Sequence, residues 1–153
     1  MMYQVTVQRT IPKNRMPSTK DLKHWAKTTL KYLKKNAELN IRIVDTQEIT
    51  ALNSEYRHKN KPTNVLSFPF DMPDEIEDEL VFLGDIIICA EVVNSEALAQ
   101  AKSLEAHWAH MVVHGTLHLL GYDHETEEDV EQMEPKEIAI LEILGFPNPY
   151  KEK

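Results

Sequence analysis

The sequence has few cysteines, no long uninterrupted apolar run and no excess of positive charge, and each of these excludes a class of protein. It contains one cysteine, Cys89, which excludes an intramolecular disulfide and fits a reducing compartment. Its longest apolar run, residues 81–93, is interrupted by Asp85 and Glu91 and therefore cannot cross a bilayer. The formal net charge of -8 argues against a general polyanion binder, so any contact with nucleic acid must be local.

A secretion signal and repeated or linker-like segments are also missing. The first ten residues, MMYQVTVQRT, alternate as a strand does and lack a basic segment followed by an apolar one. We therefore expect a cytoplasmic protein. The chain has 153 residues, 42% of them hydrophobic, which is enough for one substantial core. We expect a single domain over residues 1–153.

Hydrophobic patterns predict four strands with helices between them. The strands are expected at residues 3–8, 39–44, 65–70 and 80–89. Helices are expected at residues 18–35, 45–56, 90–101, 104–120 and from Pro135 to near Gly145, with Ser18, Asp45 and Ser103 as caps. The predicted fold class is α/β or α+β, with a roughly four-stranded mixed sheet covered by helices. The strand order does not follow from these patterns.

An acidic segment, DMPDEIEDEL at residues 71–80, separates the last two expected strands. We interpret it as a solvated loop. A cation site is the less favoured alternative, because the spacing of its carboxylates matches no calcium-binding loop.

The segment HGTLHLLGYDH, residues 114–124, contains three histidines around a glycine. His114 and His118 are four residues apart, so on a helix both imidazoles can share one metal ion. Gly121 can end that helix in a left-handed conformation and return His124 to the same point. Three imidazoles with one open position describe a catalytic zinc site. Nickel and other divalent metals that accept imidazoles remain alternatives to zinc.

Two further histidines make a different interpretation possible. His107 and His110 lie on almost the same helical face as His114 and His118, so the four residues can also form a stripe on a solvated face. The glycine followed by a third histidine favours the metal site, and we expect His107 and His110 to be bystanders.

The spacing H-x-x-x-H-x-x-G-x-x-H also resembles the metzincin metalloprotease signature. Metzincins carry a glutamate general base directly after the first histidine, and here that position is Gly115. Met133 follows His124 by only nine residues within a polar segment, so it matches the Met-turn poorly. We therefore expect a metzincin-like metal-binding helix without the peptidase mechanism.

Three blocks taken together are similar to the YbeY family of bacterial rRNA endoribonucleases. They are YRHKNKPTNVLSFPF at residues 56–70, LGDIIIC at residues 83–89, and the histidine segment. The resemblance implies a zinc-dependent, single-strand-specific endoribonuclease that acts in rRNA maturation at the small-subunit 3′ end and in ribosome quality control. Its partners would be single-stranded RNA, most of all rRNA, and the ribosome or its proteins. Arg57 matches the family's important arginine.

The residues suit phosphodiester cleavage. Zinc can polarise a phosphoryl oxygen and lower the pKa of bound water to about 7. The Arg57 guanidinium can stabilise phosphate charge by paired hydrogen bonds, with a structural salt bridge as the alternative. Lys59 and Lys61 lie beside Arg57, and the three side chains can form a small positive patch. The alternative is that the two lysines belong to a solvated loop. Asp123 can orient a ligand, accept a proton or form the turn.

The candidate catalytic residues are therefore Arg57, His114 and Asp123, and the candidate metal ligands are His114, His118 and His124. Asp85 is expected to make a structural hydrogen bond if it is buried, and Phe68 and Phe70 to pack in the core rather than stack on bases. Two alternatives stay open: another zinc hydrolase such as a peptidase, which lacks its base here, and a non-enzymatic ribosome-associated factor with a structural metal.

Overall fold

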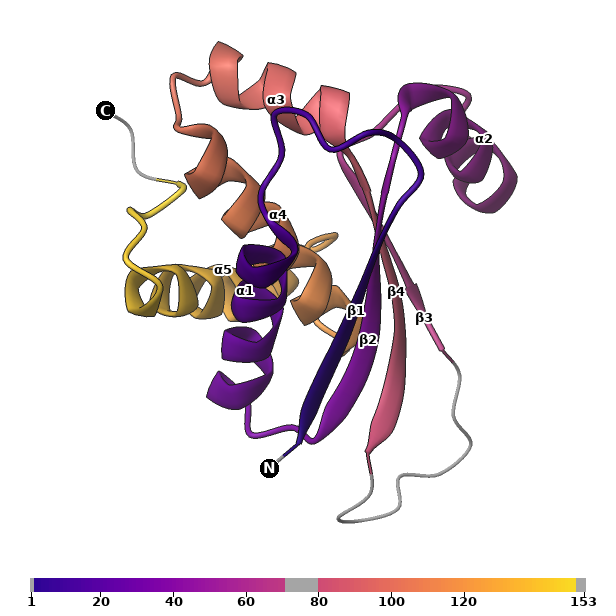
Figure 1. Ribbon diagram of the computed structural model, residues 1–153. Helices are drawn as coiled ribbons and strands as arrows, with labels where there is room; N and C mark the ends of the chain where they lie inside the picture. Colours follow the sequence, from indigo (N-terminus) through magenta and orange to yellow (C-terminus); the bar gives the residue numbers. More distant parts are fainter. Residues whose placement is uncertain (1, 71–79, 151–153) are drawn as a thin grey trace.

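A computed structural model describes residues 2–70 and 80–150, which form a four-stranded sheet and five helices (Figure 1). The strands are β1 (Tyr3–Arg9), β2 (Ala37–Val44), β3 (Val65–Pro69) and β4 (Val81–Cys89). The helices are α1 (Thr19–Tyr32), α2 (Thr46–Arg57), α3 (Ala90–Ala99), α4 (Leu104–Leu119) and α5 (Glu127–Ile143). The predicted α/β fold, a single domain with a mixed sheet, is confirmed.

The sheet has the strand order β1-β2-β4-β3. β2 is parallel to both of its neighbours, whereas β3 runs antiparallel to β4. Successive side chains of β4 enter different cores, because side chains alternate between the two faces of a strand. Ile86 and Ile88 belong to the main hydrophobic cluster, and Ile87 and Cys89 belong to a second cluster on the other face.

Helices cover both faces of this sheet, but unequally (Figure 1). The main core lies between one face and the pair α1 and α4, with α5 packed against α4. Trp108 of α4 is its largest fully buried side chain. On the opposite face, α2 contributes Ile49 to the smaller cluster. α4 packs directly on β3 and β4, and Gly115 in its C-terminal half contacts Ser67 of the edge strand β3.

The helix starts follow the predicted caps. The side chains of Ser18, Asp45 and Ser103 each accept a hydrogen bond from the backbone N–H three residues later, at 3.1, 2.8 and 3.1 Å. The carboxylate of Glu48, in the first turn of α2, accepts a hydrogen bond from Nε of Arg42 at 2.8 Å.

The last helix begins earlier than predicted. α5 starts at Glu127, and Pro135 lies inside it rather than at its first turn. A reciprocal capping box explains the start: the Thr126 hydroxyl accepts from the backbone N–H of Asp129, whose carboxylate accepts from the backbone N–H of Thr126. Met133 is fully buried in the main core, so it is a packing residue of this helix.

Two expectations concern membranes and the acidic segment. Within residues 2–70 and 80–150, no helix has the length and apolar character needed to span a membrane. The predicted solvated loop, with its alternative cation site, falls on residues 71–79 and lies outside the described residues.

Candidate metal centre and cleft

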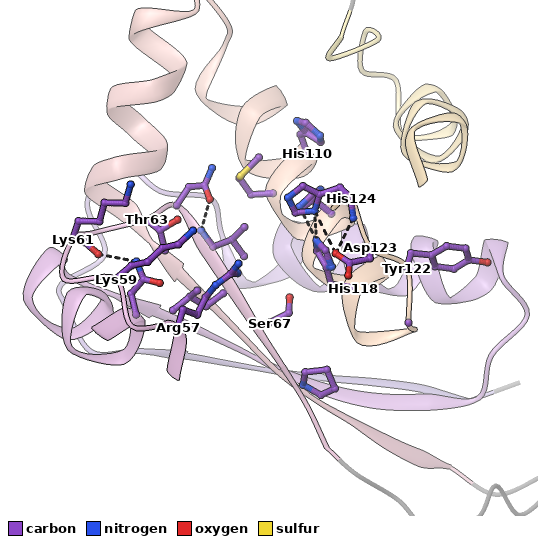
Figure 2. A pocket seen from close by; sticks show the side chains of 18 of the residues that line it. Arg57, Lys59, Lys61, Thr63, Ser67, His110, His118, Tyr122, Asp123 and His124 are labelled. Carbon is purple, nitrogen blue, oxygen red and sulfur yellow. Dashed lines mark hydrogen bonds and ion pairs between the residues drawn. The ribbon is translucent and has the colours of Figure 1, made fainter. Parts of the chain in front are cut away.

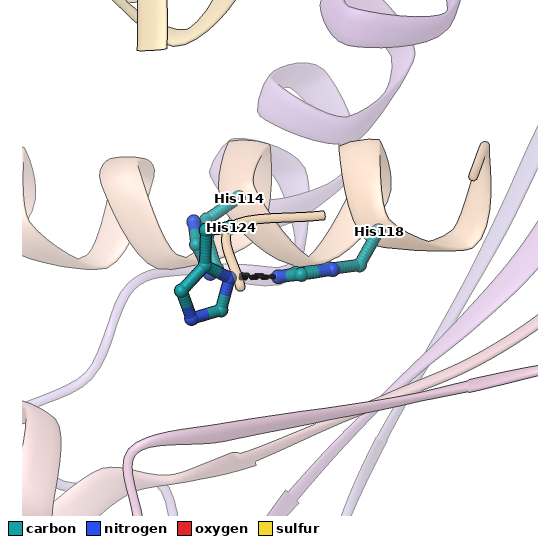
Figure 3. Close-up of side chains that lie close together, drawn as sticks. All are labelled: His114, His118 and His124. Atoms are coloured by element: carbon teal, nitrogen blue, oxygen red, sulfur yellow. Dashed lines mark hydrogen bonds between the residues drawn. The ribbon is translucent and has the colours of Figure 1, made fainter. Parts of the chain in front are cut away.

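Three imidazole nitrogens converge beside the C-terminal end of α4 (Figure 3). His114 and His118 lie one helical turn apart, and their Nε2 atoms are 3.0 Å apart. Gly121 has the predicted left-handed conformation with φ of 99°, and the chain beyond it returns His124. Nδ1 of His124 lies 2.9 Å from Nε2 of His118. The local sequence thus brings all three predicted ligands together.

The donor set fits a metal ion. Four tetrahedral ligands at zinc–nitrogen distances of about 2.0–2.1 Å lie about 3.3 Å from one another. The nitrogen–nitrogen distances of 3.0 and 2.9 Å in the cluster would therefore have to lengthen only slightly to hold zinc. Burial, together with the neighbouring His114 and His124, lowers the pKa of His118 to about 4. His118 is therefore neutral at physiological pH and has a free lone pair. The cluster of His114, His118 and His124 can hold a metal ion.

His107 and His110 lie outside this cluster, but they do not form a solvated stripe. Both are buried, at 3% and 8% exposure, because α4 packs between the sheet and α5. Nε2 of His107 lies 3.0 Å from a Glu96 carboxylate oxygen of α3, and Nε2 of His110 lies 2.8 Å from a Glu137 oxygen of α5. Burial lowers the pKa of His110 and outweighs the attraction of Glu137.

Glu137 is a residue of the site that the sequence reasoning missed. Its carboxylate is 1% exposed and contacts His110, His114 and Tyr150. Burial raises the pKa of Glu137, but hydrogen bonds from His110 and His114 outweigh that effect and lower it to about 2. Burial and the adjacent Glu137 raise the pKa of Tyr150. An ionised, fully partnered carboxylate therefore lies directly behind the histidine cluster.

Gly115 has a structural reason to stand where a metzincin carries its base. A Cβ atom at this position would lie 2.8 Å from Cγ2 of Ile86 and 3.4 Å from both Oγ of Ser67 and Cγ2 of Val65. The Ser67 hydroxyl also donates to the Gly115 carbonyl at 3.0 Å, which joins β3 to α4. The helix thus approaches the sheet too closely here for a glutamate side chain.

A cleft of about 700 Å³ opens in front of the histidines (Figure 2). His118, His124 and Asp123 form one wall, and Arg57, Lys59 and Lys61 line the other, with Ser67 between them. His114 also lines the cleft. The predicted residues therefore meet in one cavity although about sixty positions separate the two groups. The cleft is positively charged on one side in a protein of net charge -8.

The positive wall is held by a buried asparagine that sequence reasoning did not identify. Arg57 is the last residue of α2, and His58 ends the helix in a left-handed conformation with φ of 59°. The side chain of Asn53, which is 2% exposed, donates to the Lys61 backbone carbonyl at 2.9 Å, and the backbone carbonyl of Asn53 accepts from the Lys59 backbone N–H at 3.3 Å. Asn53 thereby fixes the course of the loop after α2.

Asp123 shapes the turn that carries His124. Its carboxylate accepts a hydrogen bond from the His124 backbone N–H at 2.8 Å and lies 4.0 Å from Nδ1 of the same residue. The side chain is nearly half exposed and faces the cleft, so it also remains available to a substrate.

Asp85, Phe68 and Phe70 are predicted to have structural roles rather than functional ones. The expected hydrogen bond of Asp85 is confirmed, since its carboxylate accepts from Nδ2 of Asn40 at 3.0 Å. Phe68 packs against the second hydrophobic cluster, as predicted. The prediction for Phe70 is wrong: this side chain is 54% exposed and lies edge-on to Phe82, with ring centroids 5.5 Å apart, at the end of the sheet.

An exposed aromatic side chain adjoins the cleft. Tyr56 is 59% exposed, and its ring lies edge-on to Phe68 with centroids 5.1 Å apart. Both rings line a second hollow that also contains Arg57, His118 and His124. A flat, partly exposed ring therefore lies within the same surface region as the positive loop and the histidines.

An α/β domain with three converging imidazoles in a partly basic cleft has the features of a metal-binding hydrolase for an anionic substrate. The chain belongs to the YbeY family: the family's sequence profile, described as Endoribonuclease YbeY, matches residues 6–145. Membership makes the protein a hydrolase of the nuclease class that acts in rRNA processing. The fold is also similar to the solution structure of TM1509 from Thermotoga maritima, with a TM-score of 0.59 and 24% identity over 97% of this chain and 100% of that one.

Proposed function

We propose that the protein is a zinc-dependent endoribonuclease that cleaves single-stranded RNA. The observation that carries this proposal is the cleft itself, in which three metal-ligand nitrogens face a guanidinium across a space large enough for a nucleotide. The family supplies the class of reaction, and the donor set of three imidazoles favours zinc over harder cations.

Each wall of the cleft has a chemical task in this proposal. His114, His118 and His124 hold the metal ion, which when bound supplies Lewis acidity toward a phosphoryl oxygen and water. Arg57 donates paired hydrogen bonds to phosphate oxygens as negative charge builds on them. Asp123 accepts a proton at its carboxylate or keeps His124 in place through the backbone hydrogen bond.

The surroundings favour a single strand as the substrate. Lys59 and Lys61 can follow the phosphates of an extended backbone, and Tyr56 offers a ring on which one base can stack. A base can reach that ring only when it is free of its own helical stack. The lysines and the arginine that line the cleft all belong to this short stretch, residues 57–61, which gives an acidic protein a local contact for RNA.

Family membership supports the cellular substrate. We propose that the RNA is rRNA, cleaved at the 3′ end of the small-subunit species, and that the protein works in the cytoplasm with the ribosome or its proteins as partners, including in ribosome quality control. We propose that residues 1–153 form one catalytic domain.

Two alternative functions are less well supported by the contacts. A peptidase of the metzincin type needs a glutamate at position 115, where the approach of α4 to Ile86 leaves no room for one. A purely structural metal would normally have four protein ligands, whereas three histidines meet here at the wall of an open cleft.

The test is cleavage of a labelled single-stranded RNA by the purified protein as isolated, after chelation, and after zinc is restored, with metal content measured on each sample. Chelation and His114→Ala should abolish cleavage, and zinc should restore it to the chelated wild type. Arg57→Ala should lower the cleavage rate about 100-fold or more. Arg57→Lys should recover little of the lost rate, because lysine lacks the paired N–H donors of the guanidinium group.

His24→Ala is the matched control, because His24 is exposed on α1 and is not among the residues that line the cleft. Cleavage that persists in all samples would refute the proposal. Loss of the unfolding transition on chelation, without any cleavage by the zinc-loaded protein, would instead support a structural metal.

A further inference from the structure

The carboxylate of Glu137 joins three parts of the chain behind the histidine cluster. One oxygen, Oε2, lies 2.8 Å from Nε2 of His110 and 3.0 Å from Nδ1 of His114. The other oxygen, Oε1, accepts a hydrogen bond of 2.6 Å from the hydroxyl of Tyr150. An ionised carboxylate can only accept hydrogen bonds, so each of these three partners must supply a hydrogen.

This requirement determines which nitrogen of His114 carries its hydrogen. Nδ1 of the ring faces Glu137, while Nε2, on the other side of the same ring, faces Nε2 of His118 at 3.0 Å. A neutral imidazole has one N–H and one lone pair. With the hydrogen on Nδ1, the lone pair of Nε2 points at the space between the three histidines.

We propose that Glu137 is a positioning residue of the candidate metal centre, holding His114 in the Nδ1–H tautomer and aiming its Nε2 lone pair at the metal. The inference rests on the proposed metal-dependent function. Carboxylates that accept from the distal N–H of a ligand histidine orient the ring and raise its basicity. His110 and Tyr150 take part indirectly, because their hydrogen bonds hold the carboxylate in place.

A competing arrangement uses the same residues differently. His110, His114 and Glu137 also have ligand atoms close enough to hold an ion themselves. In that arrangement His114 would bind through Nδ1, and Glu137 would exchange its hydrogen bonds for metal coordination. The positioning role is favoured because the carboxylate is already fully partnered and buried, whereas His114, His118 and His124 line the open cleft.

Tyr150 connects the segment that follows α5 to the site. Tyr150 follows α5 by seven residues, and the carbonyl of the preceding Pro149 accepts a hydrogen bond from Nζ of Lys102 at 3.0 Å. The C-terminal segment is thereby fixed where its tyrosine hydroxyl reaches Glu137.

The experiment compares zinc affinity and the tautomer of His114 in the full-length chain. Zinc dissociation constants come from competition with a chelating indicator, and nitrogen NMR of the metal-free protein reports which ring nitrogen carries the hydrogen. Glu137→Gln keeps the size and an acceptor but loses the charge, and should weaken zinc binding about 10-fold. Glu137→Met loses the acceptor as well, and should weaken it about 100-fold and release the tautomer.

Glu96→Gln is the matched control, because it alters a second carboxylate–histidine contact on α4, at His107, without touching the cluster. Its zinc affinity should stay within about twofold of wild type. If Glu137→Met does not fold, Glu137→Gln decides alone: an unchanged affinity overturns the inference.

Two further variants separate the possible outcomes. If His110→Ala abolishes zinc binding while His124→Ala preserves it, the ion sits on Glu137 and the positioning role is wrong. If the wild type binds no zinc, the proposed metal-dependent function fails. In that case the tautomer still tests the contact: a hydrogen on Nε2 of His114 in the metal-free wild type overturns the inference as well.

Discussion

Replacing Gly115 with alanine should disturb the contact between α4 and the sheet on which the histidine cluster depends. The added Cβ would lie 2.8 Å from Cγ2 of Ile86, closer than two carbon atoms approach without displacement. Helix α4 must therefore move away from β4, or Ile86 must change its position. His114 is the preceding residue of the same helix, so a shift of the helix also moves a predicted ligand.

Two opposing energies set the expected change in stability. Glycine to alanine inside a helix favours folding by about 0.5–1 kcal/mol, because alanine loses less backbone entropy. Overpacking a close contact typically costs about 1–3 kcal/mol. The free energy of unfolding of Gly115→Ala should accordingly fall by about 0–2.5 kcal/mol. Because a misplacement of about 1 Å can lower a rate about 100-fold, RNA cleavage should suffer more than stability.

A double-mutant cycle with Ile86→Ala isolates the contact from helix propensity. Ile86→Ala alone should cost about 2–5 kcal/mol, since it leaves a cavity in the main core. Once the Ile86 methyl is absent, the alanine at position 115 no longer overlaps with it, and the two changes should couple favourably by about 1–2 kcal/mol. Urea unfolding of all four proteins measures this coupling energy. Additivity within about 0.5 kcal/mol would show that α4 and the sheet do not meet as described.

Three other outcomes follow from the cleft and the core. If Lys59 and Lys61 neutralise phosphates, the slope of log affinity for single-stranded RNA against log salt should become shallower by about 0.7 for each lysine replaced with alanine. Tyr56→Ala should weaken the same binding about 5- to 100-fold through the loss of one stacked base, whereas Tyr56→Phe should retain it. Burial raises the pKa of the Cys89 thiol above its ordinary value, so the contribution of the protonated thiol to stability is complete below that ordinary value and is lost as the pH rises through the raised pKa. Urea unfolding at pH 8 and pH 10 should therefore show a smaller alkaline loss of stability in Cys89→Ala than in the wild type.

Each of these outcomes has a contrary result. An unchanged salt slope would place Lys59 and Lys61 outside the RNA path. Equal binding by Tyr56→Ala and Tyr56→Phe would mean that no base stacks on the ring. An identical alkaline loss in Cys89→Ala would mean that the thiol contributes nothing to the pH dependence.

The histidine cluster could be predicted because its geometry is local. Helical periodicity places His114 and His118 on one face, and a left-handed glycine at position 121 returns the chain to bring His124 back, so eleven residues contain nearly all of the required information. The same holds for the helix caps and the alternation of β4, which depend on neighbours a few residues away. The predicted start of α5 is wrong because proline is typical of a first turn, whereas the capping box at Thr126 begins the helix eight residues before Pro135.

The sequence by itself thus determined the fold class, the three candidate ligands and the resemblance to a nuclease family, since each depends on short-range pattern or on motif order. Only the tertiary structure decided the strand order, the close approach of Gly115 to Ile86, and the meeting of Arg57 with the histidines across one cleft. It also brought the Glu137 carboxylate into contact with His114 and Tyr150, which lie 23 and 13 positions away in the sequence. The partners of a buried glutamate cannot be predicted from periodicity or composition. They are brought together by the packing of the whole core rather than by residues adjacent in the sequence.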